Sequence, residues 1–152
     1  MLDDGEPRVH AMHSGARRIL TACGCLILFL PPIGMYFFLR ARRGRIEVSA
    51  HEIAERSLVG THARLQPDDA TRLGVLVVPL PGGVGGMGAR IKVRGDAGVN
   101  LCWKDGRGRT RSILVSMYEE PDDILAAAQR LTGLPLERVE MGTWGLRWPA
   151  RD

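Results

Sequence analysis

The stretch Ile19-Leu-Thr-Ala-Cys-Gly-Cys-Leu-Ile-Leu-Phe-Leu-Pro-Pro-Ile-Gly-Met-Tyr-Phe-Phe-Leu39 decides how this chain is organised. It contains no charged residue. At about 1.5 Å of rise per residue, a helix over the whole stretch would be about 30 Å long, which is the thickness of the hydrocarbon core of a bilayer. The stretch therefore predicts a membrane anchor over residues 17–40. The basic residues expected to flank and orient it are Arg17, Arg18, Arg40, Arg42, Arg43 and Arg45.

Pro31 and Pro32 interrupt the apolar stretch and leave two paths open. A helix that crosses the membrane can be kinked there, because proline removes a backbone donor and its ring clashes with the preceding turn. Alternatively the chain forms a hairpin that enters over Ile19–Leu30 and returns over Ile33–Leu39. We favour the kinked span, because only the whole stretch matches the bilayer. Both paths predict an inner-membrane protein whose C-terminal domain is cytoplasmic.

Composition narrows the classes of function. The chain has 152 residues and a formal net charge of +4. The basic excess lies around the apolar stretch, which does not indicate a nucleic-acid-binding domain. Residues 1–16 are polar and predict a disordered tail. His10 and His13 lie in that tail without a cysteine or carboxylate cluster at ligand spacing, so the sequence predicts no metal site.

Residues 45–140 predict a β-rich domain. Short runs of alternating or apolar residues, separated by turn signals, indicate about six or seven strands. Asp105-Gly-Arg-Gly is typical of a hairpin turn. The expected strands cover residues 45–49, 51–59, 61–66, 73–79, 89–94, 99–104 and 109–115.

One soluble helix follows these strands. Pro121 suits the first helical position, Asp122 and Asp123 complement the helix dipole, and Gly133 suits a left-handed C-cap. Residues 141–152 form the expected C-terminal tail. Trp144 and Trp148 lie in it, and they pack either against the sheet or at the membrane interface.

A glycine-rich loop is the most enzyme-like feature of the sequence. Gly83, Gly85 and Gly88 match the pattern G-x-G-x-x-G after a strand. A dinucleotide-binding loop must open a helix, whose N-terminal amides hold the phosphates. Residues 89–94 instead alternate apolar and basic side chains, which indicates a strand. We therefore expect an inter-strand loop, no catalytic residues and no cofactor.

The order of elements resembles bacterial membrane-anchored proteins with a pleckstrin-homology-like domain. The resemblance rests on Arg45-Ile-Glu-Val48 as the opening strand, on the Asp105-Gly-Arg-Gly108 hairpin, and on Tyr118-Glu-Glu-Pro-Asp-Asp-Ile-Leu125 entering the last helix. It implies an α+β fold: an N-terminal transmembrane helix followed by an antiparallel barrel or sandwich of about six or seven strands, with one C-terminal amphipathic helix. It also implies a binding function.

Basic side chains cluster on the expected strands and form a candidate patch for an anionic lipid or an acidic partner. The patch consists of Arg90, Lys92, Arg94, Lys104, Arg107, Arg109 and Arg111. The function expected from the sequence is a membrane-anchored, non-catalytic binding or scaffold module, with a membrane-associated protein partner. The alternatives are a nucleotide-binding enzyme that uses the Gly83–Gly88 loop, and a structural membrane protein that oligomerises through Gly24 or Gly34.

Overall fold

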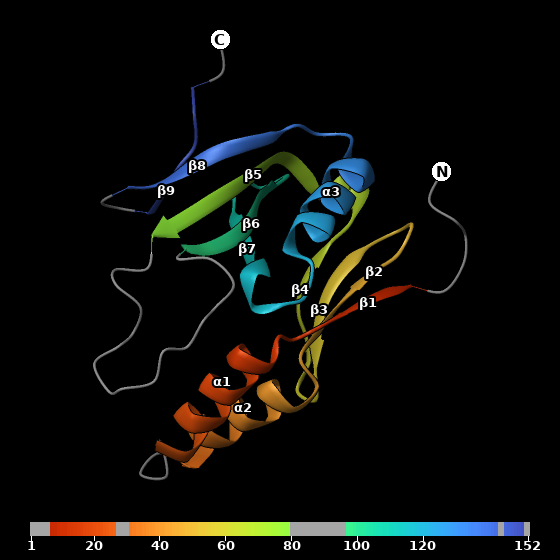
Figure 1. Ribbon diagram of the computed structural model, residues 1–152. Coiled ribbons are helices and arrows are strands. Elements are labelled where there is room, and N and C mark those ends of the chain that lie inside the picture. Colours follow the sequence, from red (N-terminus) through yellow and green to blue (C-terminus); the bar gives the residue numbers. More distant parts are fainter. Residues whose placement is uncertain (1–6, 27–30, 80–96, 143–144, 151–152) are drawn as a thin grey trace.

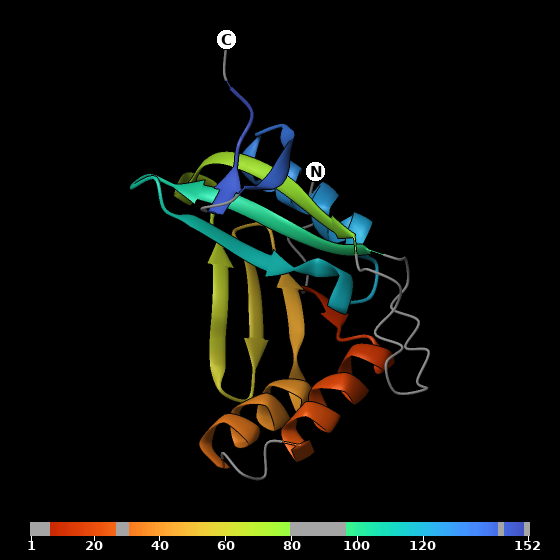
Figure 2. The same cartoon turned by 90° about the vertical axis from the view of Figure 1, so that its left-hand side faces the viewer.

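The computed structural model describes residues 7–26, 31–79, 97–142 and 145–150 (Figure 1). Two helices lie at one end of the molecule, a four-stranded sheet adjoins them, and a five-stranded sheet with a third helix lies at the other end (Figures 1 and 2). The helices are α1 (Ser14–Leu26), α2 (Pro31–Arg43) and α3 (Pro121–Thr132). The strands are β1 (Arg8–Ala11), β2 (Arg45–Val48), β3 (Ile53–Ser57), β4 (Gly60–Leu65), β5 (Ala70–Pro79), β6 (Ala97–Asp105), β7 (Thr110–Leu114), β8 (Leu136–Gly142) and β9 (Gly145–Arg147).

The apolar stretch forms two short helices, so the predicted transmembrane helix over residues 17–40 is wrong. α1 and α2 have 13 residues each and lie side by side in opposite directions (Figures 1 and 2). In the part of the chain that the structure describes, no helix has the length and apolar character needed to cross a bilayer. Pro31 and Pro32 are the first two residues of α2. Proline is favoured at the start of a helix, where no donor is missed, so the pair begins a new helix instead of kinking a long one.

The four-stranded sheet is antiparallel and has the order β1-β2-β3-β4. Its first strand comes from the segment that the sequence predicts to be a disordered tail. His10 and Met12 are buried while Arg8 and Val9 are exposed, and His10 lies opposite Ile46 in the register with β2. Burial of His10 and Met12 therefore orders part of a segment whose polar composition indicated disorder.

The five-stranded sheet has the order β7-β6-β5-β8-β9, and β5 pairs with β8 in parallel. The predicted fold was an antiparallel barrel or sandwich with its helix as the last element. It is wrong in both respects, because one strand pair is parallel and because two strands follow the helix. α3 is followed by β8 and β9, which occupy residues within and beyond the predicted domain boundary. Two strands joined by a tight turn can only be antiparallel. Here α3 carries the chain across the sheet before β8 begins, so β8 can run parallel to β5.

Side chains from both sheets and from α3 meet in one apolar core. Trp103 is its largest fully buried side chain. The other fully buried members include Ile46, Ile53, Leu65, Leu73, Leu101, Ile113, Val115 and Ile124. The two sheets and α3 thus form a single folding unit.

Local signals in the sequence correctly predict α3 and the β6–β7 turn. Gly133 caps α3 with φ of 66°, and Ile124, Ala127 and Ala128 are buried on the inner face of the helix. The backbone amides of Arg107 and Arg109 donate hydrogen bonds to the Asp105 carboxylate, at 2.9 Å each. These features depend on residues a few positions apart, which is why the sequence reveals them.

The C-terminal segment covers the outer face of the five-stranded sheet. Trp148 packs with Leu76, Cys102 and Val139, so it takes the sheet-packing alternative; Trp144 lies outside the described residues. The guanidinium of Arg72 lies 5.1 Å from the centre of the Trp148 ring and donates a 2.7 Å hydrogen bond to a backbone carbonyl beside that ring. The tail is therefore held to the sheet by both apolar and polar contacts.

Candidate functional site

An exposed apolar face lies at the helical end of the molecule. Ile33, Met35 and Tyr36 of α2 are between 37% and 59% exposed. Leu58 and Val59, in the β3–β4 turn beside α2, are also about half exposed (Figure 2). We call these five residues the apolar face. Several large apolar side chains exposed together indicate a surface that contacts a partner or a membrane.

Basic residues lie at the end of the helical hairpin that adjoins the sheet. Arg17 and Arg18 are exposed near the start of α1, and Arg42 and Arg43 are exposed at the end of α2. Because the two helices run in opposite directions, both pairs lie at the same end (Figure 2). We call these four residues the basic collar. A cationic band at the base of an apolar element suits an anionic membrane surface.

The other two predicted flanking arginines make ion pairs within the protein. Arg45 Nε lies 2.7 Å from an oxygen of Glu47. Arg40 Nη2 donates a 2.7 Å hydrogen bond to Glu55 Oε1, and Glu55 is only 4% exposed. Arg40 therefore acts within the fold, as the link between α2 and β3.

A buried polar cluster joins the hairpin to β3 and to the segment between β7 and α3. Glu55 Oε1 accepts hydrogen bonds from Arg40 of α2 and from the Tyr118 hydroxyl, the latter at 2.6 Å. Tyr118 lies in the segment between β7 and α3. Burial, followed by the negative charge of Glu55, raises the pKa of Tyr118 above its usual value, so the phenol stays a donor. The cluster fixes the orientation of the hairpin relative to the rest of the molecule.

His62 of β4 lies beside α2 of the hairpin. Its ring is 5.9 Å from the Tyr36 ring in an edge-on arrangement, and its Nε2 lies 2.6 Å from the Ser57 hydroxyl oxygen. Burial, together with the nearby positive charge of Arg40, lowers the pKa of His62. His62 is half-buried, with α2 on one side of it.

The structure brings together only part of the basic patch predicted from the sequence. Arg90, Lys92 and Arg94 lie outside the described residues, as does the Gly83–Gly88 loop. Lys104 Nζ lies 5.7 Å from the centre of the Trp148 ring on the outer face of the sheet.

The β6–β7 hairpin carries the rest of the predicted patch. Arg111 lies opposite the buried Trp103, so it belongs to the other face from Lys104. Arg107 and Arg109 are exposed around the β6–β7 turn, beside Asp68, Asp69 and Asp105. The described basic residues of the predicted patch are therefore divided between faces and mixed with acids.

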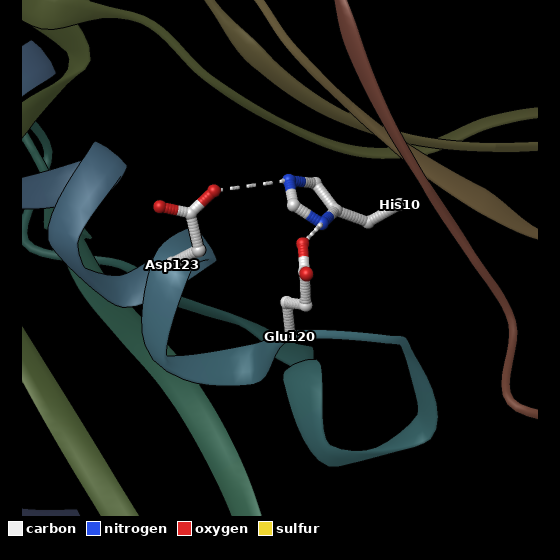
Figure 3. Close-up of side chains that lie close together, drawn as sticks. All are labelled: His10, Glu120 and Asp123. Atoms are coloured by element: carbon white, nitrogen blue, oxygen red, sulfur yellow. Dashed lines mark ion pairs between the residues drawn. The ribbon is translucent and has the colours of Figure 1, made fainter.

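A second polar group was missed by the sequence analysis. His10 of β1 faces Glu120 and Asp123 at the start of α3 (Figure 3). Its Nδ1 lies 3.8 Å from Glu120 Oε2, and its Nε2 lies 3.7 Å from Asp123 Oδ2. A histidine and two carboxylates are common metal ligands. Their separation in the sequence left no spacing pattern that would have identified them.

Alkaline pH is expected to destabilise the fold. Burial raises the pKa of Cys102 to about 11, and the pKa of Tyr118 is also raised. In the unfolded chain these groups lose their protons near the ordinary values of 9.0 and 10.0, while the folded chain retains them. Their contribution to stability is therefore complete below about pH 9 and is lost as the pH rises through the folded-state pKa values. Urea unfolding at about pH 8, 9 and 10.5 measures the loss.

Two variants test whether Cys102 and Tyr118 cause this loss of stability at alkaline pH. For Cys102 the rise in pKa corresponds to about 3 kcal/mol at full effect, at about 1.4 kcal/mol per pKa unit. Cys102→Ala and Tyr118→Phe should each flatten the dependence of the urea midpoint on pH. A wild-type midpoint that stays constant from about pH 8 to pH 10.5 would contradict the prediction.

Comparisons with models of protein families, with curated proteins and with solved structures found no match to this chain.

Proposed function

We propose that this chain is a non-catalytic binding module that its helical hairpin holds at the cytoplasmic surface of a cell membrane. The observation that carries the proposal is the combination of the basic collar on the hairpin with the apolar face, which lies on α2 and the adjoining β3–β4 turn. The sequence adds that the four residues between α1 and α2 are Ile27-Leu-Phe-Leu30, all of them apolar. The hairpin therefore has apolar residues toward one end, with Ile33 and Met35 near the start of α2, and basic residues at the other end, next to the sheet.

The length of the helices suits insertion into one leaflet. Thirteen residues of helix measure about 20 Å, against about 15 Å for the hydrocarbon of one leaflet. Elements that lie in the interface bind through buried apolar area and through attraction of Lys or Arg to anionic lipids. Each basic residue of the collar contributes about 1 kcal/mol near an anionic surface. The excess of arginine favours the cytoplasmic leaflet.

The binding role rests on the position that the five-stranded sheet would take relative to the membrane. The Glu55 cluster ties α2 to β3 and to the segment before α3. A hairpin held in the membrane would therefore hold the five-stranded sheet at a fixed distance and orientation, since that sheet lies at the opposite end (Figures 1 and 2). A fixed platform close to the bilayer suits recognition of a membrane-associated protein partner.

The oligomerisation alternative has less support. Gly34, one of the two glycines that it requires, is buried by the chain's own residues. Close packing at a small residue favours helix association, but here a single chain already uses that surface.

Flotation of the full chain with vesicles tests the proposal. We expect binding to vesicles of phosphatidylcholine with phosphatidylglycerol, and weaker binding to phosphatidylcholine alone or at high salt. Met35→Asp is expected to weaken binding at least tenfold, because it replaces an exposed apolar side chain of the hairpin with a charge.

The matched control is Met141→Asp. Met141 is 66% exposed on β8, in the five-stranded sheet, and the substitution is chemically identical. It should leave vesicle binding unchanged. The proposal fails if the full chain does not float with either type of vesicle, or if the two variants lose binding equally.

A further inference from the structure

We propose that His10, Glu120 and Asp123 form a binding site for a divalent transition-metal ion, with Zn²⁺ as the best match. One ligand atom from each residue can be chosen so that all three lie within 4.8 Å of one another. Figure 3 shows the imidazole of β1 between the two carboxylates at the start of α3. The site is independent of the apolar face and of the basic collar.

His10 is the residue that points to a ligand. It is 95% buried, and its Nε2 atom is inaccessible to solvent without a hydrogen-bond partner among the described residues. A buried polar nitrogen left without a partner destabilises a fold, so such atoms usually serve a purpose. Here the nitrogen faces a carboxylate oxygen of Asp123.

The distances favour a shared ion over direct contact. The 3.7 Å between His10 Nε2 and Asp123 Oδ2 is longer than the roughly 2.7–3.2 Å of a nitrogen-to-oxygen hydrogen bond. Glu120 lies 3.8 Å from the other ring nitrogen, Nδ1, so its carboxylate has to turn to reach an ion held at Nε2. Two ligands that each lie about 2.0–2.2 Å from one zinc ion are themselves about 3.3–3.7 Å apart, depending on the angle between them. The spacing between His10 and Asp123 lies at the wide end of that range.

Charge and access also fit a cation. Two carboxylates balance a divalent ion when the imidazole is neutral. Glu120 has an exposed side chain that can turn toward the ion, and its backbone is held in the left-handed region with φ of 53°. A cavity of about 400 Å³ is lined by His10, Glu120 and Tyr118, so a hydrated ion can approach the ring from the Glu120 side.

Two opposing effects set the limits of the affinity. The positive end of the α3 dipole disfavours a cation, although Glu119 adds negative charge nearby. Arg8 Nη1 lies 3.6 Å from the same Asp123 oxygen, but its side chain is mostly exposed and can move into solvent. Three protein ligands leave a fourth position for water.

A bound ion would strengthen the junction between the two halves of the core. β1 already contacts the segment before α3, because the amide of Glu119 donates to the Ala11 carbonyl at 2.9 Å. Coordination would add a link between β1 and α3 across the same junction, and β1 leads directly into the helical hairpin. Metal binding would thus stabilise the position of the hairpin on the domain.

Titration of the untagged full chain with ZnCl2 tests the site. Calorimetry is expected to show one equivalent bound per chain, and Zn²⁺ is expected to raise the Tm relative to the chain in chelator. Co²⁺ should give the visible absorption of a four-coordinate site. Asp123→Asn should weaken binding at least tenfold and abolish the rise in Tm.

Asp122→Asn is the matched control, because Asp122 is exposed, adjacent and in the same helical turn. It should bind Zn²⁺ as the wild type does. His10→Ala should remove binding altogether, and Asp123→Asn keeps the test decisive if the loss of a buried histidine impairs folding. Equal affinity of the Asp122 and Asp123 variants, or a wild-type chain that neither binds Zn²⁺ nor gains Tm from it, would overturn the proposal.

Discussion

Replacement of Arg40 by methionine is expected to lower the free energy of unfolding by about 3 kcal/mol. The substitution removes the cation that faces Glu55 and leaves a buried carboxylate with the Tyr118 hydroxyl as its remaining donor in this cluster. Breaking a buried ion pair from one side costs roughly 3–5 kcal/mol, and the lower value applies here because the Arg40 side chain is 27% exposed. Urea unfolding followed by circular dichroism measures the change.

Two further variants separate the lost ion pair from other effects. Arg43→Met, in the same last turn of α2 but exposed, should change stability by no more than about 0.5 kcal/mol. Glu55→Gln in the Arg40→Met background should restore part of the loss, because it removes the unpaired charge. If the Arg40 and Arg43 variants are equally stable, the cluster does not hold the hairpin as we infer.

The Arg40 variant also bears on how the hairpin is oriented. When its link to β3 is cut, α2 should exchange its amide hydrogens faster, while β5 and β6 change little. Vesicle binding should persist in this variant, since the apolar face and the basic collar are unchanged. This combination of results would separate attachment to the membrane from the orientation of the domain.

Gly74→Val is the second substitution with a large expected effect, a loss of about 3 kcal/mol. A Cβ atom at Gly74 would lie 2.4 Å from Val139 Cγ2, 2.9 Å from Trp148 Cζ3 and 3.0 Å from the Glu137 carbonyl oxygen. Overpacking of a well-filled site costs roughly 1–3 kcal/mol, and the nearby backbone oxygen cannot yield as a side chain does. Chemical unfolding and tryptophan fluorescence measure the loss and the displacement of Trp148.

Gly98→Val provides the comparison within the same sheet. A Cβ at Gly98 would meet its nearest atoms, Leu114 Cδ1 and the Val78 carbonyl oxygen, at 3.8 Å and 3.9 Å, which is ordinary contact. Because valine also suits a strand better than glycine does, this variant should be neutral or slightly stabilising. Alanine at Gly74 already brings a Cβ against Val139 Cγ2, so Val139→Ala should reduce the loss of stability caused by Gly74→Ala when the two are combined. A Gly74→Val protein as stable as the Gly98→Val protein would contradict the close packing of the C-terminal segment.

Some of the candidate features had a signal in the sequence. The alternation from Ile53 to Glu55 places both side chains on one face, which indicates that an acid points inward. The signal does not reveal the partners, because Arg40 lies in the hairpin and Tyr118 is 63 residues further along the chain. His10 gave no signal, since its carboxylate neighbours come from α3, far along the chain.

The sequence by itself determined the features that depend on neighbouring residues. These are the break in the apolar stretch at Pro31 and Pro32, the turn at Asp105, and the limits of α3. Each follows from backbone preferences that act within about one turn of chain.

Only the tertiary structure decided what depends on distant segments. The pair of prolines permitted either a kinked span or a reversal, and the packing of α2 against α1 and the Arg40–Glu55 contact select the reversal. Residues 8–11 became a strand because they pair with β2 and because His10 is buried there against the start of α3. The C-terminal tail became part of the sheet because Gly74 leaves room for it. Burial between segments far apart in the chain supplies stabilisation that no local pattern records.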